Sequence, residues 1–313
     1  ATVHSVEPLR REAELILSTD TVDDHEAVLA LGNQLIPLDP SLAARLFAHT
    51  ARSAQTGGQW VRAAIAGEHE VRAWLAAGRT DDTVAAAHRT IQAADSISDV
   101  DTRLRVLANL APSLREVGLA DQAVDILTRV VAERRAQAEA TGAADVEEAL
   151  MVALVNLATV LVDQGRAAEG LDLLQEAQEL AERRNDLRRL GTIKINMAFA
   201  YSATGQLRLA REAYRAAADL YRQSGASAGD VGYALRGEAA TLARVGRFAE
   251  AIQVYAEAIR LFREARAPLE VVRASIGHLM ARASLRERIS DAEIDQIEQD
   301  LDQLPLHEQG QLA

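Results

Sequence analysis

The chain has 313 residues, of which 49% are hydrophobic and 4% aromatic, and its formal net charge is −12 at pH 7. This acidic balance argues against direct binding to nucleic acid, because phosphate recognition requires a clustered basic surface. The absence of cysteine excludes disulfide bonds, thiolate metal sites and a cysteine nucleophile. It also suits a reducing compartment, so we expect a cytoplasmic protein.

Helical periodicity dominates the chain. Residues 1–20 are predicted to be a lead-in with one short helix, from Pro8 to Leu17. Residues 21–304 are predicted to form one repeat domain of antiparallel helix pairs, because no stretch shows the sustained period-2 alternation of a strand. We expect about seven pairs, at 22–36 with 39–55, 59–77 with 80–96, 99–117 with 120–138, 145–164 with 167–184, 187–204 with 207–224, 228–245 with 248–265, and 268–286 with 291–303.

Two stretches bear on how the chain is anchored and where it ends. The longest apolar run, residues 149–162, is far below the roughly 20 residues that a helix needs to cross a bilayer, so we expect no membrane partner. Residues 305–313 follow the last predicted helix without a clear stop signal. We expect them to begin a further segment of a longer protein.

A glycine recurs after the first helix of five successive pairs. These glycines are Gly78, Gly118, Gly165, Gly205 and Gly246. Glycine at this place supplies the left-handed cap that other residues adopt only at a cost. A period of about 40 residues indicates stacked helical repeats, each burying its apolar face against its neighbours. The sequence therefore predicts an all-α solenoid.

The residues around these glycines resemble the tetratricopeptide repeat superfamily, most closely over residues 99–265. Small residues stand seven before, five after and twelve after the glycine, and a large apolar residue stands four before and nine after it. The best copies have Ala158, Leu161, Gly170, Leu174 and Ala177; Ala198, Tyr201, Ala210, Tyr214 and Ala217; and Ala239, Leu242, Ala251, Tyr255 and Ala258. The unit around Gly78 departs from the pattern, with Val71 and Thr83 at two of the small positions.

The period is similar to that of the longer repeats of kinesin light chains and bacterial signal-transduction regulators. The resemblance implies a right-handed superhelix whose first helices line a concave groove for a peptide or a protein segment. It does not imply which partner binds, because one repeat architecture serves many clients.

An asparagine recurs nine residues before the glycine, at Asn109, Asn156 and Asn196. Asparagine is unfavourable inside a helix, because its side chain competes for local backbone bonds. Its amide offers a donor and an acceptor to an extended peptide backbone, and the family resemblance implies peptide contact. The alternative is that these amides bridge neighbouring helices or bond a carbonyl within the array.

Arginines outnumber acids on the inferred groove face, which indicates an acidic partner. The alternative is a solvated face with internal ion pairs. Three further residues at comparable positions would add contact area. The candidate groove residues are therefore Arg72, Arg105, Arg115, Arg236, Arg244, Thr159, Phe199 and Tyr233, besides the three asparagines.

No catalytic, metal or cofactor signature is present: the sequence has no HExxH, P-loop, dinucleotide fingerprint or GxSxG motif. We therefore expect a non-catalytic module that binds a protein or peptide, as part of a larger bacterial protein. The alternative is the sensor arm of a signal-transduction ATPase, a transcription regulator or a repeat-fused caspase-like protease. Self-association through the end repeats is also expected, since terminal repeats expose an unpartnered face.

Overall fold

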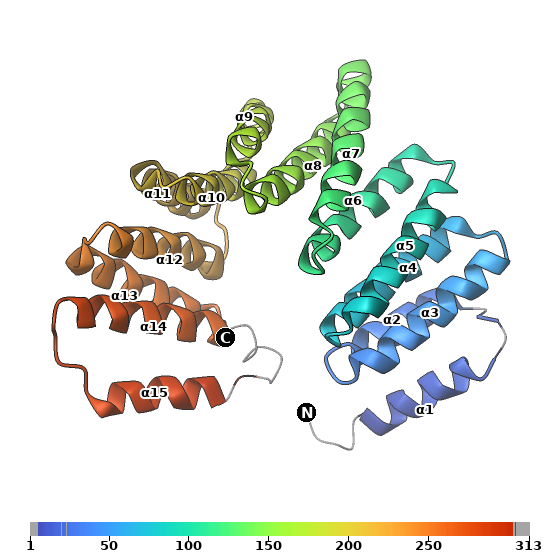
Figure 1. Cartoon of the computed structure of the whole chain (residues 1–313), viewed down its shortest axis with the longest axis horizontal. Helices are drawn as coiled ribbons and strands as arrows, with labels where there is room; N and C mark the ends of the chain where they lie inside the picture. The colour runs from blue at the N-terminus through green and yellow to red at the C-terminus, as the bar shows by residue number, and fades with distance from the viewer. Residues whose placement is uncertain (1–5, 20, 23, 303, 305–313) are drawn as a thin grey trace. The chain divides into compact units, whose positions relative to one another are not determined.

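The protein is described by a computed structural model at residues 6–19, 21–22, 24–302 and 304. Over these residues it has fifteen α-helices and no strand, which confirms the all-α prediction (Figure 1). The predicted residues 305–313 lie outside the described range. The helices are α1 (Val6–Leu17), α2 (His25–Leu35), α3 (Pro40–Thr56), α4 (Trp60–Ala76), α5 (Thr80–Asp95), α6 (Val100–Glu116), α7 (Ala120–Thr141), α8 (Ala144–Asp163), α9 (Ala167–Arg183), α10 (Leu187–Ala203), α11 (Leu207–Gln223), α12 (Ala228–Arg244), α13 (Phe248–Glu264), α14 (Pro268–Ser284) and α15 (Asp291–Asp302).

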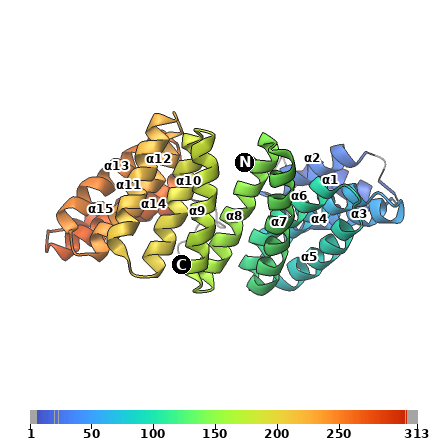
Figure 2. The same ribbon diagram turned by 90° about the horizontal axis from the view of Figure 1, so that it is seen from above.

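The chain divides into two compact units, Ala1–Val160 and Leu161–Ala313. That residues 21–304 act as one domain stays a prediction. Within each unit, consecutive helices pack as hairpins: α3 on α4 and α6 on α7 in the N-terminal unit, and α10 on α11 and α12 on α13 in the C-terminal unit (Figures 1 and 2). First helices of successive pairs also contact each other, α4 with α6 and α12 with α14. In the N-terminal unit α2 also contacts α4, so three first helices follow one another there.

The predicted glycine caps are present. Gly78, Gly118, Gly165, Gly205 and Gly246 have φ of 67°, 82°, 78°, 75° and 81°. At Gly205 the left-handed turn directs the backbone N–H of Gln206 to the carbonyl oxygen of Tyr201 at 2.8 Å, which satisfies a carbonyl that the end of α10 would leave without a partner. The same turn starts the next helix two residues later, so the glycine fixes the hairpin geometry.

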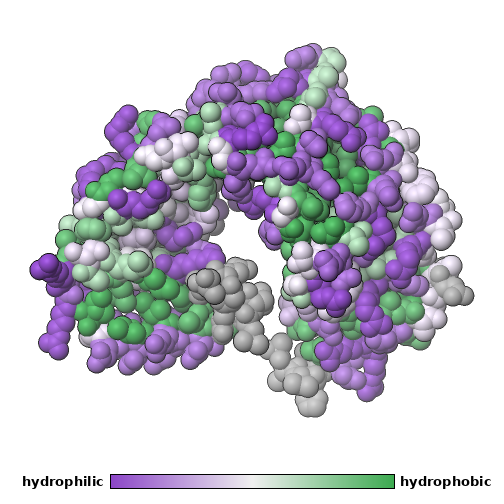
Figure 3. Space-filling model, in the orientation of Figure 1, coloured by the Kyte–Doolittle hydropathy of each residue, from purple (hydrophilic) through white to green (hydrophobic). Residues whose placement is uncertain are grey.

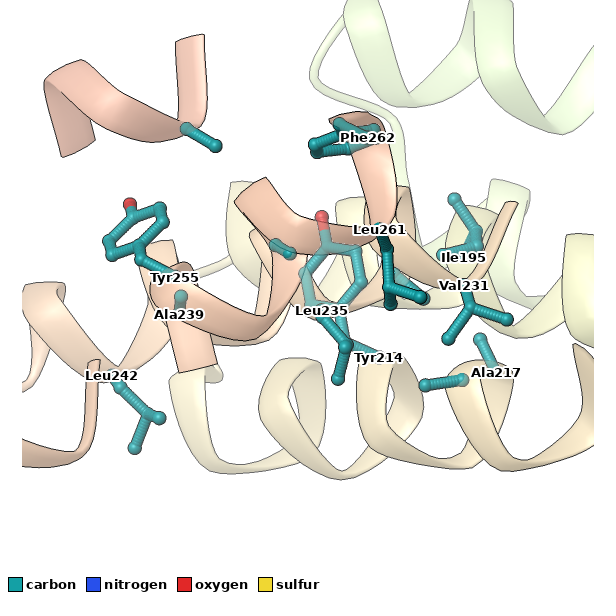
Figure 4. Close-up of a cluster of buried hydrophobic side chains, with 14 of the residues drawn as sticks. Ile195, Tyr214, Ala217, Val231, Leu235, Ala239, Leu242, Tyr255, Leu261 and Phe262 are labelled. Atoms are coloured by element: carbon teal, nitrogen blue, oxygen red, sulfur yellow. The ribbon is translucent and has the colours of Figure 1, made fainter. Parts of the chain in front are cut away.

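The core of the C-terminal unit depends on tyrosines that pack on glycines. Tyr214 of α11 and Tyr255 of α13 lie among Leu235, Ala239 and Leu242 of α12 and other buried residues (Figure 4). A Cβ atom at Gly237 of α12 would lie 2.6 Å from Cδ1 of Tyr214, closer than real Cβ contacts. The missing side chain therefore allows Tyr214 to pack on the first helix of the next pair, and Tyr255 packs in the same way on Gly277 of α14.

The N-terminal unit has a separate core around Phe47, which α1, α2 and α3 enclose together with Ala73 of α4. Here too a ring packs on a glycine, since a Cβ atom at Gly32 would overlap the ring of Phe47. None of the described helices is at once long and apolar enough to cross a membrane.

Candidate partner-binding surface

On the first-helix face of the N-terminal unit, Glu68 of α4 collects three predicted groove residues. Asn109 of α6 donates from Nδ2 to Oε2 of Glu68 at 3.3 Å. The pKa of Glu68 is raised, mainly because burial disfavours the charged carboxylate, although Asn109, Arg105 and Arg72 act in the opposite direction. Its Oε1 atom is buried and has no hydrogen-bond partner. The cluster thus joins α4 to α6 around an incompletely satisfied carboxyl group.

Arg72 has a second neighbour, His69, on the same helix. Nη2 of Arg72 lies 2.6 Å from Nδ1 of His69, and the same nitrogen lies 3.0 Å from Oδ1 of Asn33 in α2. Burial, and then the charge of Arg72, lower the pKa of His69 to about 4. The imidazole is therefore neutral at pH 7, and Nδ1 either donates to Oδ1 of Asn33 or accepts from Arg72, depending on the tautomer. With its hydrogen on Nδ1, His69 links α4 to α2 by a hydrogen bond and not by charge.

A pocket of about 510 Å³ lies beside this cluster in the N-terminal unit, and Arg105 and Asn109 line it. Its lining also includes Asp101, Asp145 and Glu148. Arg134 of α7 is buried and pairs with Asp101 across the pocket wall. The pocket has mixed charge, so it does not itself favour an acidic partner.

The three asparagines differ in their contacts. Asn109 reaches the neighbouring first helix at Glu68, whereas Asn196 donates to the carbonyl oxygen of Thr192 in its own helix at 2.9 Å. Asn156 is half-buried in α8, and Thr159 in the same helix donates to the carbonyl oxygen of Val155 at 2.8 Å. Arg115 lies half-buried in the last turn of α6. The three asparagines occupy equivalent positions in the repeat, yet the printed bonds of Asn109 and Asn196 go to different kinds of partner.

Four predicted groove residues meet in the C-terminal unit. Phe199 of α10 and Tyr233, Arg236 and Arg244 of α12 line one pocket of about 200 Å³, together with Ser202, Tyr214, Gly237, Ala240 and Thr241. A cavity of roughly 150 Å³ accommodates benzene, so this pocket has room for one ring-sized or branched apolar side chain. Phe199 remains 44% exposed, although its ring meets that of Tyr214 edge to face at 5.9 Å between centroids.

The charges around this pocket are positive. No Asp or Glu is among the described residues that line it. The guanidinium carbon of Arg236 lies 5.0 Å from the ring centroid of Tyr233, and its Nε lies 3.1 Å from Oε2 of Glu270 in α14. For Arg236, the structure therefore has the internal ion pair that the sequence analysis gave as the alternative to contact with an acidic partner.

Arg244 differs from Arg236, because no ion pair joins it to a carboxylate of the described chain. Its Nη2 donates only to the carbonyl oxygen of Ser202, at 3.4 Å. Its side chain is exposed at the end of α12. A ligand carboxylate that approaches the pocket would therefore find an uncompensated guanidinium, which binds carboxylates with two parallel hydrogen bonds.

The sequence did not identify several residues that shape the pocket. Tyr214 entered the sequence analysis only as a large residue of the repeat pattern, yet it lines the pocket, and burial raises the pKa of its phenol to about 12. Thr241 donates to the carbonyl oxygen of Gly237 at 2.9 Å and lines the floor. The sequence did contain one signal for this pocket. Position 237 lies nine residues before Gly246, where the three preceding repeats have asparagine, and it is a glycine because the Tyr214 ring occupies the space of a side chain.

No group of three or more His, Cys, Asp or Glu side chains within the described ranges is arranged to hold a metal ion. The surface therefore offers hydrogen bonds, one pocket for an apolar group and positive charge.

Comparison with known proteins supports the repeat assignment. The family model "Tetratricopeptide repeat" matches residues 149–223 and 189–264. The segment 149–264 therefore consists of tetratricopeptide repeats, as the pattern around the glycines predicted. No protein of curated function matches the sequence.

Three solved structures share the fold at low sequence identity. A putative kinesin light chain from Podosopora anserina is 17% identical, with a TM-score of 0.53 over 64% of this chain and 95% of that one. The Rap conjugation gene regulator of plasmid pLS20, in complex with the Phr* peptide, is 12% identical, with a TM-score of 0.58 over 95% and 83%. A signal-transduction ATPase with a tetratricopeptide repeat sensor, from Pyrococcus horikoshii, is 12% identical, with a TM-score of 0.56 over 96% and 53%.

Proposed function

We propose that this tetratricopeptide-repeat chain is a non-catalytic module that binds an acidic peptide or protein segment on the first-helix face of its C-terminal unit. The observation that supports this most strongly is the pocket between α10, α11 and α12, where Phe199, Tyr233 and Tyr214 surround an apolar space and Arg244 stands at its side without a carboxylate. A peptide-bound structure of the same fold supports a peptide as the ligand class.

The arrangement favours a partner with two features close together. An apolar side chain of ring size would enter the pocket and bury its surface against Phe199 and Tyr233. An Asp or Glu within a residue or two would then reach Arg244 in a partly desolvated setting. The pocket walls come from packed helices, so little ordering is needed on binding.

Selection from a random peptide display library on the full chain tests the proposal. We expect the enriched peptides to combine a large apolar residue with Asp or Glu within two positions. Their binding should fall about tenfold or more in Phe199→Ala and in Arg244→Ala, because each substitution removes one half of the recognition.

The matched control is Arg247→Ala, which changes the net charge equally three residues away. Arg247 is exposed and pairs with Glu250 of its own helix at 2.6 Å. Enriched peptides without acidic residues, or equal losses in Arg244→Ala and Arg247→Ala, would contradict the proposal.

A second candidate is a sensor arm within a larger regulator. The likeness to the Pyrococcus horikoshii ATPase favours it, since this chain matches about half of that protein, which includes a tetratricopeptide repeat sensor. The complete reading frame tests it: an ATPase, transcription-regulator or protease domain joined to this chain supports the sensor arm, and a frame without one contradicts it.

A further inference from the structure

The last helix, α15, differs in charge from the helices before it. It has six Asp or Glu residues and no Lys or Arg, whereas residues 187–284, which span α10 to α14, have 15 Lys or Arg against eight Asp or Glu. An acidic helix therefore follows directly on a basic stretch within the same unit. Opposite charge favours association between the two and helps to select the partner.

α15 itself buries little apolar surface, although Leu304, which follows it, is 3% exposed. It has no buried residue, whereas each of the helices α9 to α14 buries four or more. Ile294 of α15 is 45% exposed and Met280 of α14 is 67% exposed. Hydrophobic side chains gather on the surface over α14 and α15 (Figure 3). The apolar side chains of α15 are therefore only partly buried against α14.

The polar attachment of α15 centres on one arginine. Arg282 of α14 donates to a carboxylate oxygen of Glu293 in α15, and to Oε2 of Glu287 at 2.9 Å in the connecting segment. Glu293 also accepts from the backbone N–H and the hydroxyl of Ser290, at 3.0 and 2.9 Å, which fixes the start of the helix. A single carboxylate thus both starts α15 and ties it to α14.

A hollow remains beneath α15. A pocket of about 410 Å³ lies between α15 and the α13–α14 hairpin, with Phe262, Ala267, Pro268 and Val271 as its apolar lining and Arg263 and Arg266 as its basic lining. The only contribution of α15 to this lining is Asp300. The surface therefore has space for a larger apolar side chain at a place where α15 presents a carboxylate.

We propose that the α13–α14 surface beneath α15 is a docking site for an acidic amphipathic helix of a partner protein, and that α15 is a displaceable strap that covers it in the partner's absence. Arg263 and Arg266 would attract the acidic face of the partner helix. The pocket would accept a large apolar side chain of that helix at the position that Asp300 has in α15. This site is separate from the pocket around Phe199 and Arg244 and does not depend on it.

The experiment uses the full chain and a fluorescent synthetic peptide with the sequence of residues 289–304. Glu293→Gln releases the strap but leaves Arg282 free for the peptide. We expect this variant to bind the peptide about five- to tenfold more tightly than the unsubstituted chain, as measured by fluorescence anisotropy. The matched control, Glu298→Gln, removes the same charge from the same helix at an exposed position without changing the Arg282 contact, and should bind as the unsubstituted chain does.

A second peptide with Asp300→Leu should bind more tightly than the first, because leucine fills the pocket. Equal binding by all three proteins would overturn the proposal. So would the absence of binding by a Glu293→Gln protein that remains folded, as shown by a cooperative urea transition followed by far-ultraviolet circular dichroism. Dimers of Glu293→Gln without peptide would assign the surface to a second copy of this chain instead. Loss of peptide binding in Arg244→Ala would place the peptide in the other pocket and also overturn the proposal.

Discussion

Replacing Gly237 by alanine tests the packing that builds the C-terminal pocket. The new Cβ atom would lie 2.6 Å from Cδ1 of Tyr214, a residue that is only 4% exposed. Overpacking of this kind costs about 1–3 kcal/mol. Alanine is favoured over glycine inside a helix by about 1 kcal/mol. The difference between these two effects is a loss of about 0–2 kcal/mol. Because the contact is with a buried ring and not a flexible side chain, we expect a loss in the upper half of that range.

Gly229→Ala on the same helix is the matched control. A Cβ atom there would lie 3.4 Å from Cβ of Ala265 and 3.6 Å from Oγ of Ser227, which are ordinary van der Waals contacts. The helix preference should then dominate and raise the stability by up to about 1 kcal/mol. Urea unfolding followed by far-ultraviolet circular dichroism measures both variants.

The two substitutions should therefore shift the unfolding midpoint in opposite directions. Gly237→Ala should also weaken binding of selected peptides, because a displaced Tyr214 ring would enter the pocket that it lines. A Gly237→Ala protein as stable as the unsubstituted chain would refute the argument that this glycine exists to admit the tyrosine ring.

Two further predictions follow from individual side chains. Asn109→Ala should lower the free energy of unfolding by about 1–2 kcal/mol, because the half-buried carboxylate of Glu68 then loses its amide donor. A change of less than about 0.5 kcal/mol in urea unfolding would contradict this reasoning. The Ser290 backbone bond, and then Arg282, lower the pKa of Glu293 from 4.5 to about 2. The ionised form is thus favoured in the folded state, so its stabilisation of α15 should be fully present above pH 4.5 and lost as the pH falls through about 2. The chain has no cysteine, so Gln299→Cys provides a single site for a fluorophore on α15. Its emission should report the release of α15 as the pH falls, and Glu293→Gln in the same protein should abolish this pH dependence.

Repetition made most of the fold predictable from the sequence. Gly205 and its four equivalents mark the end of a first helix because a left-handed turn there is unfavourable for other residues, and the structure has a positive φ at each one. The same period placed Phe199, Tyr233, Arg236 and Arg244 on one face, and these four line one pocket.

Contacts between residues far apart in sequence were not predictable in this way. Glu270 of α14 forms an ion pair with Arg236 of α12, and no local sequence pattern predicts a pair between residues so far apart. Equivalent positions also differ in role, since Asn109 bonds a side chain of the preceding repeat whereas Asn196 bonds its own helix. Periodicity fixes where a side chain stands, and the neighbouring residues decide what it contacts.

Photo-crosslinking with a selected peptide tests most directly whether the first-helix face holds the partner. Benzoylphenylalanine would replace either Phe199, at the pocket, or Gln253, an exposed residue on the second helix α13. We predict a covalent adduct with the peptide at position 199 and none at position 253. An adduct at position 253, with none at position 199, would contradict the binding surface proposed for this protein.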